Sequence, residues 1–236
     1  MQKPWYSPAY VISMAEDLVK DYGQDNMDKD TLFQRVGEMK GAAIMLLALH
    51  KAFGKHFLMQ SSQEESPDVF TLYQEEVPGK NIDTKYQTVE VVIYETHSKM
   101  PVADFVLKSK LINPKKAYDE DTIILCYIRK GGTFIDFNIL YEELKKHKFK
   151  PSNVFVLGNK ISNERMFILS QVWPIIHHEI VDYVARANSY PLPYKMFFKR
   201  GVTSKLDYKV GTTVLKTNPF EVFDIDEEKV KEKYKR

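Results

Sequence analysis

Cysteine is nearly missing from this chain, which has a single thiol, Cys126, among 236 residues. An intramolecular disulfide therefore cannot form, and this suits a protein of the reducing cytoplasm. Cys126 lies in the apolar run TIILCYI, which favours a buried, inert thiol over a catalytic nucleophile. We expect a cytoplasmic protein that depends on its core rather than on disulfides.

Long apolar runs are also missing. No stretch reaches the ~18 apolar residues that a membrane-spanning helix needs. The longest candidate, AAIMLLALHKAF, is shorter and contains His50 and Lys51. The first residues, MQKPWYSPAY, lack a basic region followed by an apolar core, so we expect neither a signal peptide nor a membrane partner.

Several motifs of well-known enzyme classes are absent. The segments KGG at 130–132 and LGN at 157–159 lack the spacing of a phosphate-binding loop, and no Gly-x-Ser-x-Gly sequence occurs. Zinc-ligand spacing is absent as well. Because these motifs are absent, nucleophilic hydrolases and nucleotide-binding folds have little support.

The formal charge of +2 is nearly neutral, so it neither indicates nor excludes a nucleic-acid partner.

The remaining sequence is typical of a globular protein, with 44% apolar and 28% charged residues. Helical and extended periodicities alternate along it. Helices are predicted at 8–22, 30–53, 101–111, 137–147 and 175–187, with polar connections at 24–29 and 74–85; strands are predicted at 57–60, 68–73, 88–95, 122–128, 153–157 and 166–172, with short ones after 194, including 221–223. We expect an α/β fold, with one mixed sheet flanked by helices in residues 1–193. Residues 194–236 would form a strand-rich extension that ends in a charged helix or a frayed tail.

The most informative stretch is residues 66–95. It places Asp68 at the start of one strand and Glu90 inside the next strand, whose two faces are both largely apolar. Such a strand is expected at the centre of a sheet, where a glutamate is costly unless it is hydrogen-bonded or bound to a metal. Glu90 is therefore either a structural charge partner or a site residue. Two carboxylates on neighbouring strands can share a divalent metal.

The residues Pro67-Asp68 and the strand TVEVV at 88–92, preceded by a helix with Glu38, resemble the core of the PD-(D/E)XK nuclease superfamily over about residues 30–130. The resemblance implies a restriction-endonuclease-like sheet and a metal-dependent nuclease that acts on DNA. Asp68 and Glu90 would be catalytic and would bind Mg²⁺, with Glu38 as an auxiliary ligand. From its helical position alone, Glu38 is expected to be a solvated side chain.

One position departs from the family pattern. The family places a lysine two residues after the glutamate, where this chain has Val92. That lysine positions or activates the attacking water, so either another residue replaces it or the site is catalytically dead. Lys85, Lys99 and Lys108 are candidate substitutes, and nothing in the sequence selects among them.

Basic residues gather in two segments, KKHKFK at 145–150 and the stretch 195–209. In the second, Lys195, Lys199, Arg200 and Lys205 are interleaved with aromatic residues. Cations can contact phosphates while aromatic rings stack on bases, which predicts nucleic-acid binding. A strand pair with core aromatics and a solvated lysine edge is the alternative interpretation.

A weaker candidate site is the pair His178 and Asp182. On the predicted helix 175–187 the two residues are four apart and would share one face, where they could bind a transition metal or serve ordinary packing.

Two functional hypotheses follow from these patterns. The first is a metal-dependent nuclease, and the second is a non-catalytic nucleic-acid-binding or assembly subunit on the same fold. A protein partner or a homo-oligomer is compatible with both.

Overall fold

The computed structural model of the chain describes residues 3–62, 66–77, 80–94, 101–111, 118, 120–129, 135–146, 151–160, 163–191, 195–196 and 218–235. Its strands are β1 (Trp5–Tyr6), β2 (Phe57–Ser61), β3 (Val69–Val77), β4 (Lys80–Tyr94), β5 (Thr122–Ile128), β6 (Asn153–Lys160), β7 (Asn163–Trp173), β8 (His177–Asp182) and β9 (Lys195–Met196). Its helices are α1 (Pro8–Tyr22), α2 (Gln24–Lys29), α3 (Gln34–Phe53), α4 (Val102–Val106), α5 (Phe137–Lys146), α6 (Tyr183–Asn188), α7 (Pro219–Phe223) and α8 (Glu227–Tyr234). A 3₁₀ turn, Thr31–Phe33, precedes α3, and a π-helical turn, Leu107–Leu111, continues α4.

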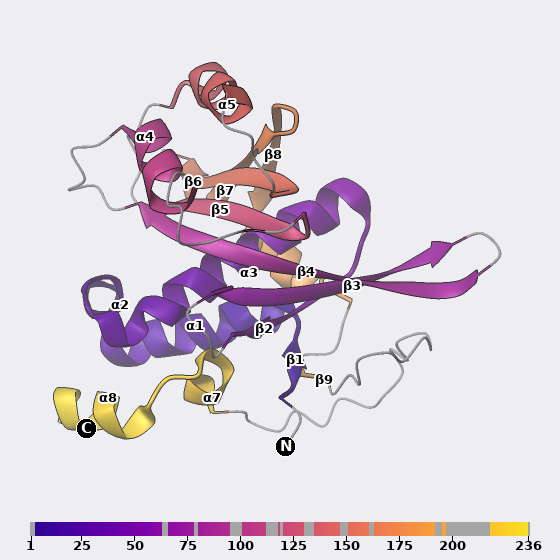
Figure 1. Cartoon of the computed structure of the whole chain (residues 1–236). Coiled ribbons are helices and arrows are strands. Elements are labelled where there is room, and N and C mark those ends of the chain that lie inside the picture. The colour runs from indigo at the N-terminus through magenta and orange to yellow at the C-terminus, as the bar shows by residue number, and fades with distance from the viewer. Residues whose placement is uncertain are drawn as a thin grey trace.

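One mixed sheet organises the part of the chain that the structure describes. Its strands follow the order β8-β7-β6-β5-β4-β3-β2-β1-β9, with β4 in the middle. The three central strands β4, β5 and β6 are parallel, while the strands on both sides of them pair antiparallel. The protein is therefore an α/β fold with an open mixed sheet flanked by helices, as predicted (Figure 1).

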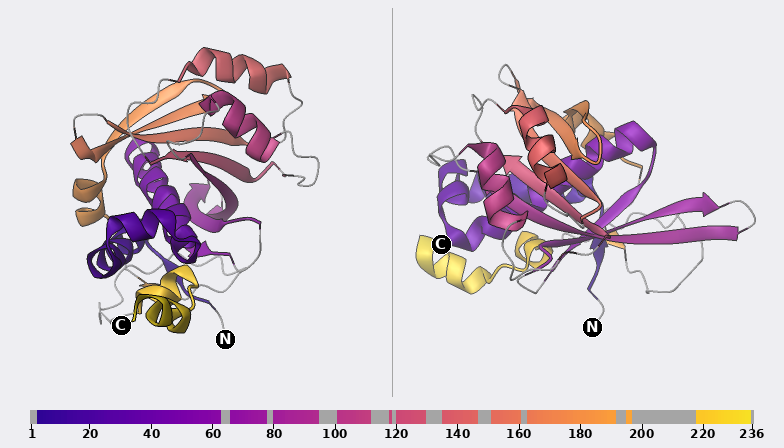
Figure 2. Two further views of the ribbon diagram at one scale, coloured as in Figure 1. Left: turned by 90° about the vertical axis from the view of Figure 1, so that its left-hand side faces the viewer. Right: turned by 45° about the horizontal axis from the view of Figure 1, so that its top comes forward.

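Helices cover both faces of the sheet. Helices α1 and α3 lie on one face, and α4 and α5 lie on the other (Figures 1 and 2). Two hydrophobic clusters correspond to these layers, a larger one that includes α1 and α3 and a smaller one that includes α4 and α5. Successive side chains of β4 point alternately into the two clusters, which explains why this strand is apolar on both faces.

Helix α3 is the central helix of the larger layer. From Gly41 to Leu49 all its residues are buried, because the sheet lies on one side of it and α1 on the other. Gly37 and Gly41 permit the close approach that their spacing predicts. A Cβ atom at Gly37 would lie 1.7 Å from the guanidinium nitrogen Nη2 of Arg129, and one at Gly41 would lie 2.7 Å from Cδ1 of Tyr127.

Most of the predicted elements are confirmed, and four predictions are wrong. The segment 24–29 is helix α2 rather than a turn. The polar segment 74–85 is mostly paired strand, because β3 and β4 continue as a hairpin that extends beyond the helices (Figure 1). A two-stranded hairpin that has no apolar face has the same composition as a loop. The sequence pattern therefore did not indicate these strands.

The third wrong prediction concerns the segment 175–187. Instead of one helix it forms strand β8, which pairs with β7, and the short helix α6. The side chain of Asp182 accepts a hydrogen bond from the backbone of Ala185 at 3.0 Å and caps α6. Asp182 is therefore the N-cap of α6, and it lies in the middle of the segment that was predicted to be one continuous helix.

The fourth wrong prediction is the strand at 221–223, which is helix α7, capped by Asn218 with Pro219 in its first turn. The charged segment after it forms helix α8, one of the two predicted alternatives. Both helices contribute to the larger hydrophobic cluster, through Phe223 and Val230 among others. The other strands predicted between 197 and 217 lie outside the described residues.

A candidate acidic site beside the central strand

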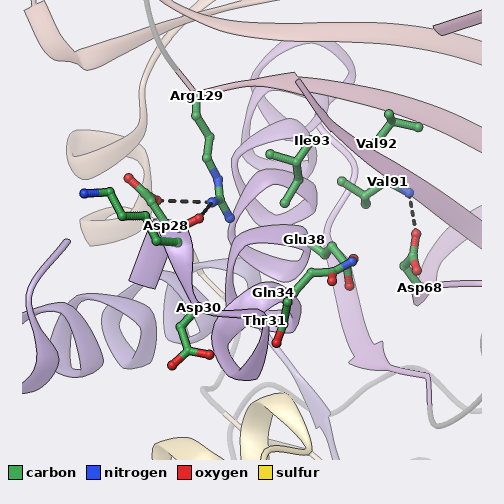
Figure 3. A pocket seen from close by; sticks show the side chains of 11 residues that line it. Asp28, Asp30, Thr31, Gln34, Glu38, Asp68, Val91, Val92, Ile93 and Arg129 are labelled. Carbon is green, nitrogen blue, oxygen red and sulfur yellow. Dashed lines mark hydrogen bonds and ion pairs between the residues drawn. The ribbon is translucent and has the colours of Figure 1, made fainter. Parts of the chain in front are cut away.

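Asp68 lies where strand β3 begins and the edge of β4 becomes open. The two strands pair up to Val69 opposite Val89, and β4 continues alone on this side. The Asp68 backbone N–H donates to the Val89 carbonyl at 3.2 Å, and the Val91 N–H donates to Oδ2 of Asp68 at 2.7 Å (Figure 3). The carboxylate thus extends the hydrogen-bond ladder by one step after the strand has ended.

Glu90 lies close to Asp68 along β4. Asp68 is hydrogen-bonded to Val89 and Val91, the residues on either side of Glu90. Glu90 is fully buried, and the Ser66 hydroxyl donates a hydrogen bond to its Oε1. The fold therefore brings together the two carboxylates that the sequence singled out.

Glu38 approaches from the opposite face of the sheet. It is 6% exposed, so the expectation of a solvated side chain is wrong. Gln34 donates to its Oε1 at 2.7 Å, and the Arg35 Nε lies 3.9 Å from its Oε2. Because the first turn of α3 faces the open edge of β4, Glu38 lines the same pocket as Asp68 (Figure 3).

This pocket has a volume of about 430 Å³. Its wall is formed by residues 91–93 of β4, by the first turns of α3 and by residues 28–31 (Figure 3). Arg129, just after β5, closes one side and pairs with Asp28 at 3.2 Å. The pocket therefore lies beside the carboxyl ends of two parallel strands, where open α/β sheets commonly bind ligands.

Among the described residues, none of the candidate lysines lies beside Glu90, where the nuclease motif has its lysine. Val92 is buried and apolar. Lys85 lies farther along the hairpin and pairs with Asp83 at 2.7 Å, and Lys108 is exposed on the turn after α4. Lys99 lies outside the described residues. Lys29 lines the pocket, but its side chain is 78% exposed and lies 3.5 Å from Asp25.

Tyr118 is a buried tyrosine near the acidic residues that the sequence patterns did not indicate. It packs on the α4 side of the sheet, the side toward which Glu90 points. Its hydroxyl oxygen is buried and has no hydrogen-bond partner among the described residues. Burial raises the pKa of Tyr118, and the negative charges of Glu90 and Asp68 raise it further, so the hydroxyl stays protonated near both carboxylates.

Asp68 and Glu90 are the residues of this site that could hold a divalent ion. Within the described part of the chain, no group of three or more His, Cys, Asp or Glu residues is arranged to hold a metal. Mg²⁺, however, is usually bound through one or two carboxylates, with water and phosphate oxygens completing its shell. Asp68 and Glu90 supply that number, while Glu38 lies on the other face of β4.

His178 and Asp182 do not form a metal site. His178 and Asp182 belong to strand β8, where residues four apart are separated by about 13 Å. His178 instead lies 2.8 Å from the Ser170 hydroxyl, while Asp182 caps α6. Lys195 belongs to the short strand β9, and Lys199, Arg200 and Lys205 lie outside the described residues.

Cys126 behaves as expected. It is a free, fully buried thiol, and burial raises its pKa to about 12.

No family model, curated protein or solved structure matches this chain. None of the helices in the described residues is both long enough and apolar enough to cross a bilayer.

Proposed function

We propose that this protein has a PD-(D/E)XK nuclease-like fold and acts on DNA through a divalent cation bound by Asp68 and Glu90. The observation that supports this most is that Asp68 is hydrogen-bonded to the two residues of β4 that flank Glu90, at the open edge of this strand. Both acidic residues are buried, and Asp68 and Glu38 line a cavity that can admit a ligand.

The order of the elements also supports the proposal. The run α3, β2, β3, β4, α4 and β5 consists of a helix, an antiparallel meander and a helix that leads to a strand parallel to β4. This arrangement resembles the core of the superfamily, in which the helix carries the auxiliary acid and the second and third strands carry the paired acids. Glu38, Asp68 and Glu90 occupy these elements or their ends.

In this proposal Asp68 and Glu90 hold Mg²⁺, and Glu38 contributes negative charge from the α3 side. When bound, the ion would lower the pKa of a coordinated water and stabilise the charge that develops on a phosphodiester group. Asp68 is held in place by the Val91 N–H and Glu90 by the Ser66 hydroxyl.

A cleavage assay tests this function. A labelled DNA duplex is incubated with the protein and Mg²⁺ or Mn²⁺, with and without chelator. We expect divalent-ion-dependent cleavage that falls more than about 100-fold in Asp68→Asn and Glu90→Gln, because even groups that only orient metal ligands contribute about 10- to 100-fold. Glu38→Gln should lose about 10-fold, as an auxiliary group.

The matched control is Glu228→Gln, which removes an exposed carboxylate from α8. Its cleavage rate should equal that of the wild type. If the wild type, Asp68→Asn and Glu90→Gln all give the same product with the same dependence on metal, the proposed catalytic role of the pair is wrong.

A specific observation favours a second candidate, a non-catalytic nucleic-acid-binding or assembly subunit. Val92 is buried where the family has its lysine, and no described lysine replaces it. This candidate predicts DNA binding that weakens with salt and is unchanged in Asp68→Asn. Lys199→Ala and Arg200→Ala should each lower the slope of log affinity against log salt by about 1. Salt-independent association with a protein would contradict it.

A further inference from the structure

The Tyr118 hydroxyl is a buried polar group whose role the fold does not explain. Its oxygen has no hydrogen-bond partner among the described residues. Leaving such a group unpaired costs about 1–3 kcal/mol, and native proteins keep few of them. A ligand or a bound water is a common reason for retaining one at a functional site.

The position of the hydroxyl indicates which ligand it serves. Tyr118 lies against the hydrophobic cluster of α4 and α5, and Glu90 is on the face of β4 that this cluster covers. Asp68 is hydrogen-bonded to the two residues that flank Glu90, and both carboxylates act electrostatically on the hydroxyl. The hydroxyl therefore lies near both acidic residues.

The chemistry of the hydroxyl suits a hydrated cation. A phenol can donate one hydrogen bond and accept another, so it can bind a water molecule that is itself bound to a metal. A phenol carries no positive charge, so it cannot supply the charge of the family lysine, but it can orient water as that lysine does.

We propose that Tyr118 is a positioning residue of this site, whose hydroxyl is hydrogen-bonded to water in the hydration shell of a divalent cation held by Asp68 and Glu90. The inference depends on the proposed function, because it requires the acidic pair to bind the ion.

The variant Tyr118→Phe tests the role, because it removes the oxygen and keeps the ring. Without divalent ions, the variant should unfold at the same temperature as the wild type or higher, since an unpaired buried hydroxyl is lost. Titration calorimetry with Mn²⁺ should show binding that is about 3- to 10-fold weaker, the value of one hydrogen bond. If the hydroxyl were only structural, its removal would lower the unfolding temperature and leave the affinity for Mn²⁺ unchanged.

Tyr141→Phe is the matched control. Tyr141 is a half-buried tyrosine of the same layer that packs on Trp173, with ring centroids 5.8 Å apart. It should leave the affinity for Mn²⁺ unchanged. If Tyr118→Phe binds Mn²⁺ as tightly as the wild type, or if it lowers the unfolding temperature in chelator, the role of Tyr118 is refuted while the acidic pair stands. Absence of Mn²⁺ binding by the wild type would refute both proposals.

Discussion

Asp68 combines a structural task with its proposed function, and two substitutions separate them. Its carboxylate accepts the Val91 N–H at 2.7 Å where strand β3 is no longer present to do so. Both residues are buried, at 8% and 4% exposure. In Asp68→Ala the Val91 N–H loses its partner inside the protein, whereas Asp68→Asn keeps an oxygen acceptor of the same size.

The magnitudes follow from the kind of hydrogen bond. A bond to a charged acceptor contributes about 1.5–3 kcal/mol and a neutral one about 0.5–1.5 kcal/mol. We expect Asp68→Ala to lower the free energy of unfolding by about 2 kcal/mol and Asp68→Asn by about 1 kcal/mol. For a chain of this size, these values correspond to decreases in Tm of about 4–8 °C and 2–4 °C.

Thermal unfolding in the presence of chelator measures both values without any contribution from a bound metal. Asp83→Asn is the control. Asp83 lies on β4, the strand that contains Val91, and it forms an ion pair with Lys85 at 43% side-chain exposure. Exposed pairs contribute about 0–1 kcal/mol, so its Tm should change little. Equal decreases for the alanine and asparagine variants, or no decrease for alanine, would refute the structural task of Asp68.

Two further predictions concern the two glycines of α3 that pack closely against other side chains. Gly41→Ala should destabilise the protein by about 1–2 kcal/mol in denaturant unfolding, because the new methyl group meets the buried ring of Tyr127. Gly37→Ala meets the movable end of Arg129 instead, so the gain in helix propensity of about 1 kcal/mol should offset the disturbance. If Gly37→Ala proved the more damaging, this distinction would be wrong. Cys126 should resist iodoacetamide at pH 8 in the folded protein and react after unfolding, because burial raises its pKa to about 12; rapid labelling of the folded protein would contradict this.

The elements that could be predicted from the sequence are those whose signals are local. Ser7 and Pro8 start α1 and Gly23 ends it, as capping chemistry requires. The apolar pattern of β4 on both faces correctly predicted a central strand. Asp182 carried a local signal for the start of α6, but the prediction extended a helix across it because pairing with β7 is not visible in the sequence.

The candidate site could be predicted only in part from the sequence, and the rest required the tertiary structure. The sequence by itself indicated that Asp68 comes at the start of one strand and Glu90 within the next, and that Cys126 is buried. Tertiary structure decided that Asp68 is hydrogen-bonded to both neighbours of Glu90 and that Glu38 is buried. It also placed Tyr118 near the acidic pair, across a long stretch of chain. Strand register and the packing of helices on a sheet depend on contacts between distant segments, and local propensities do not encode those contacts.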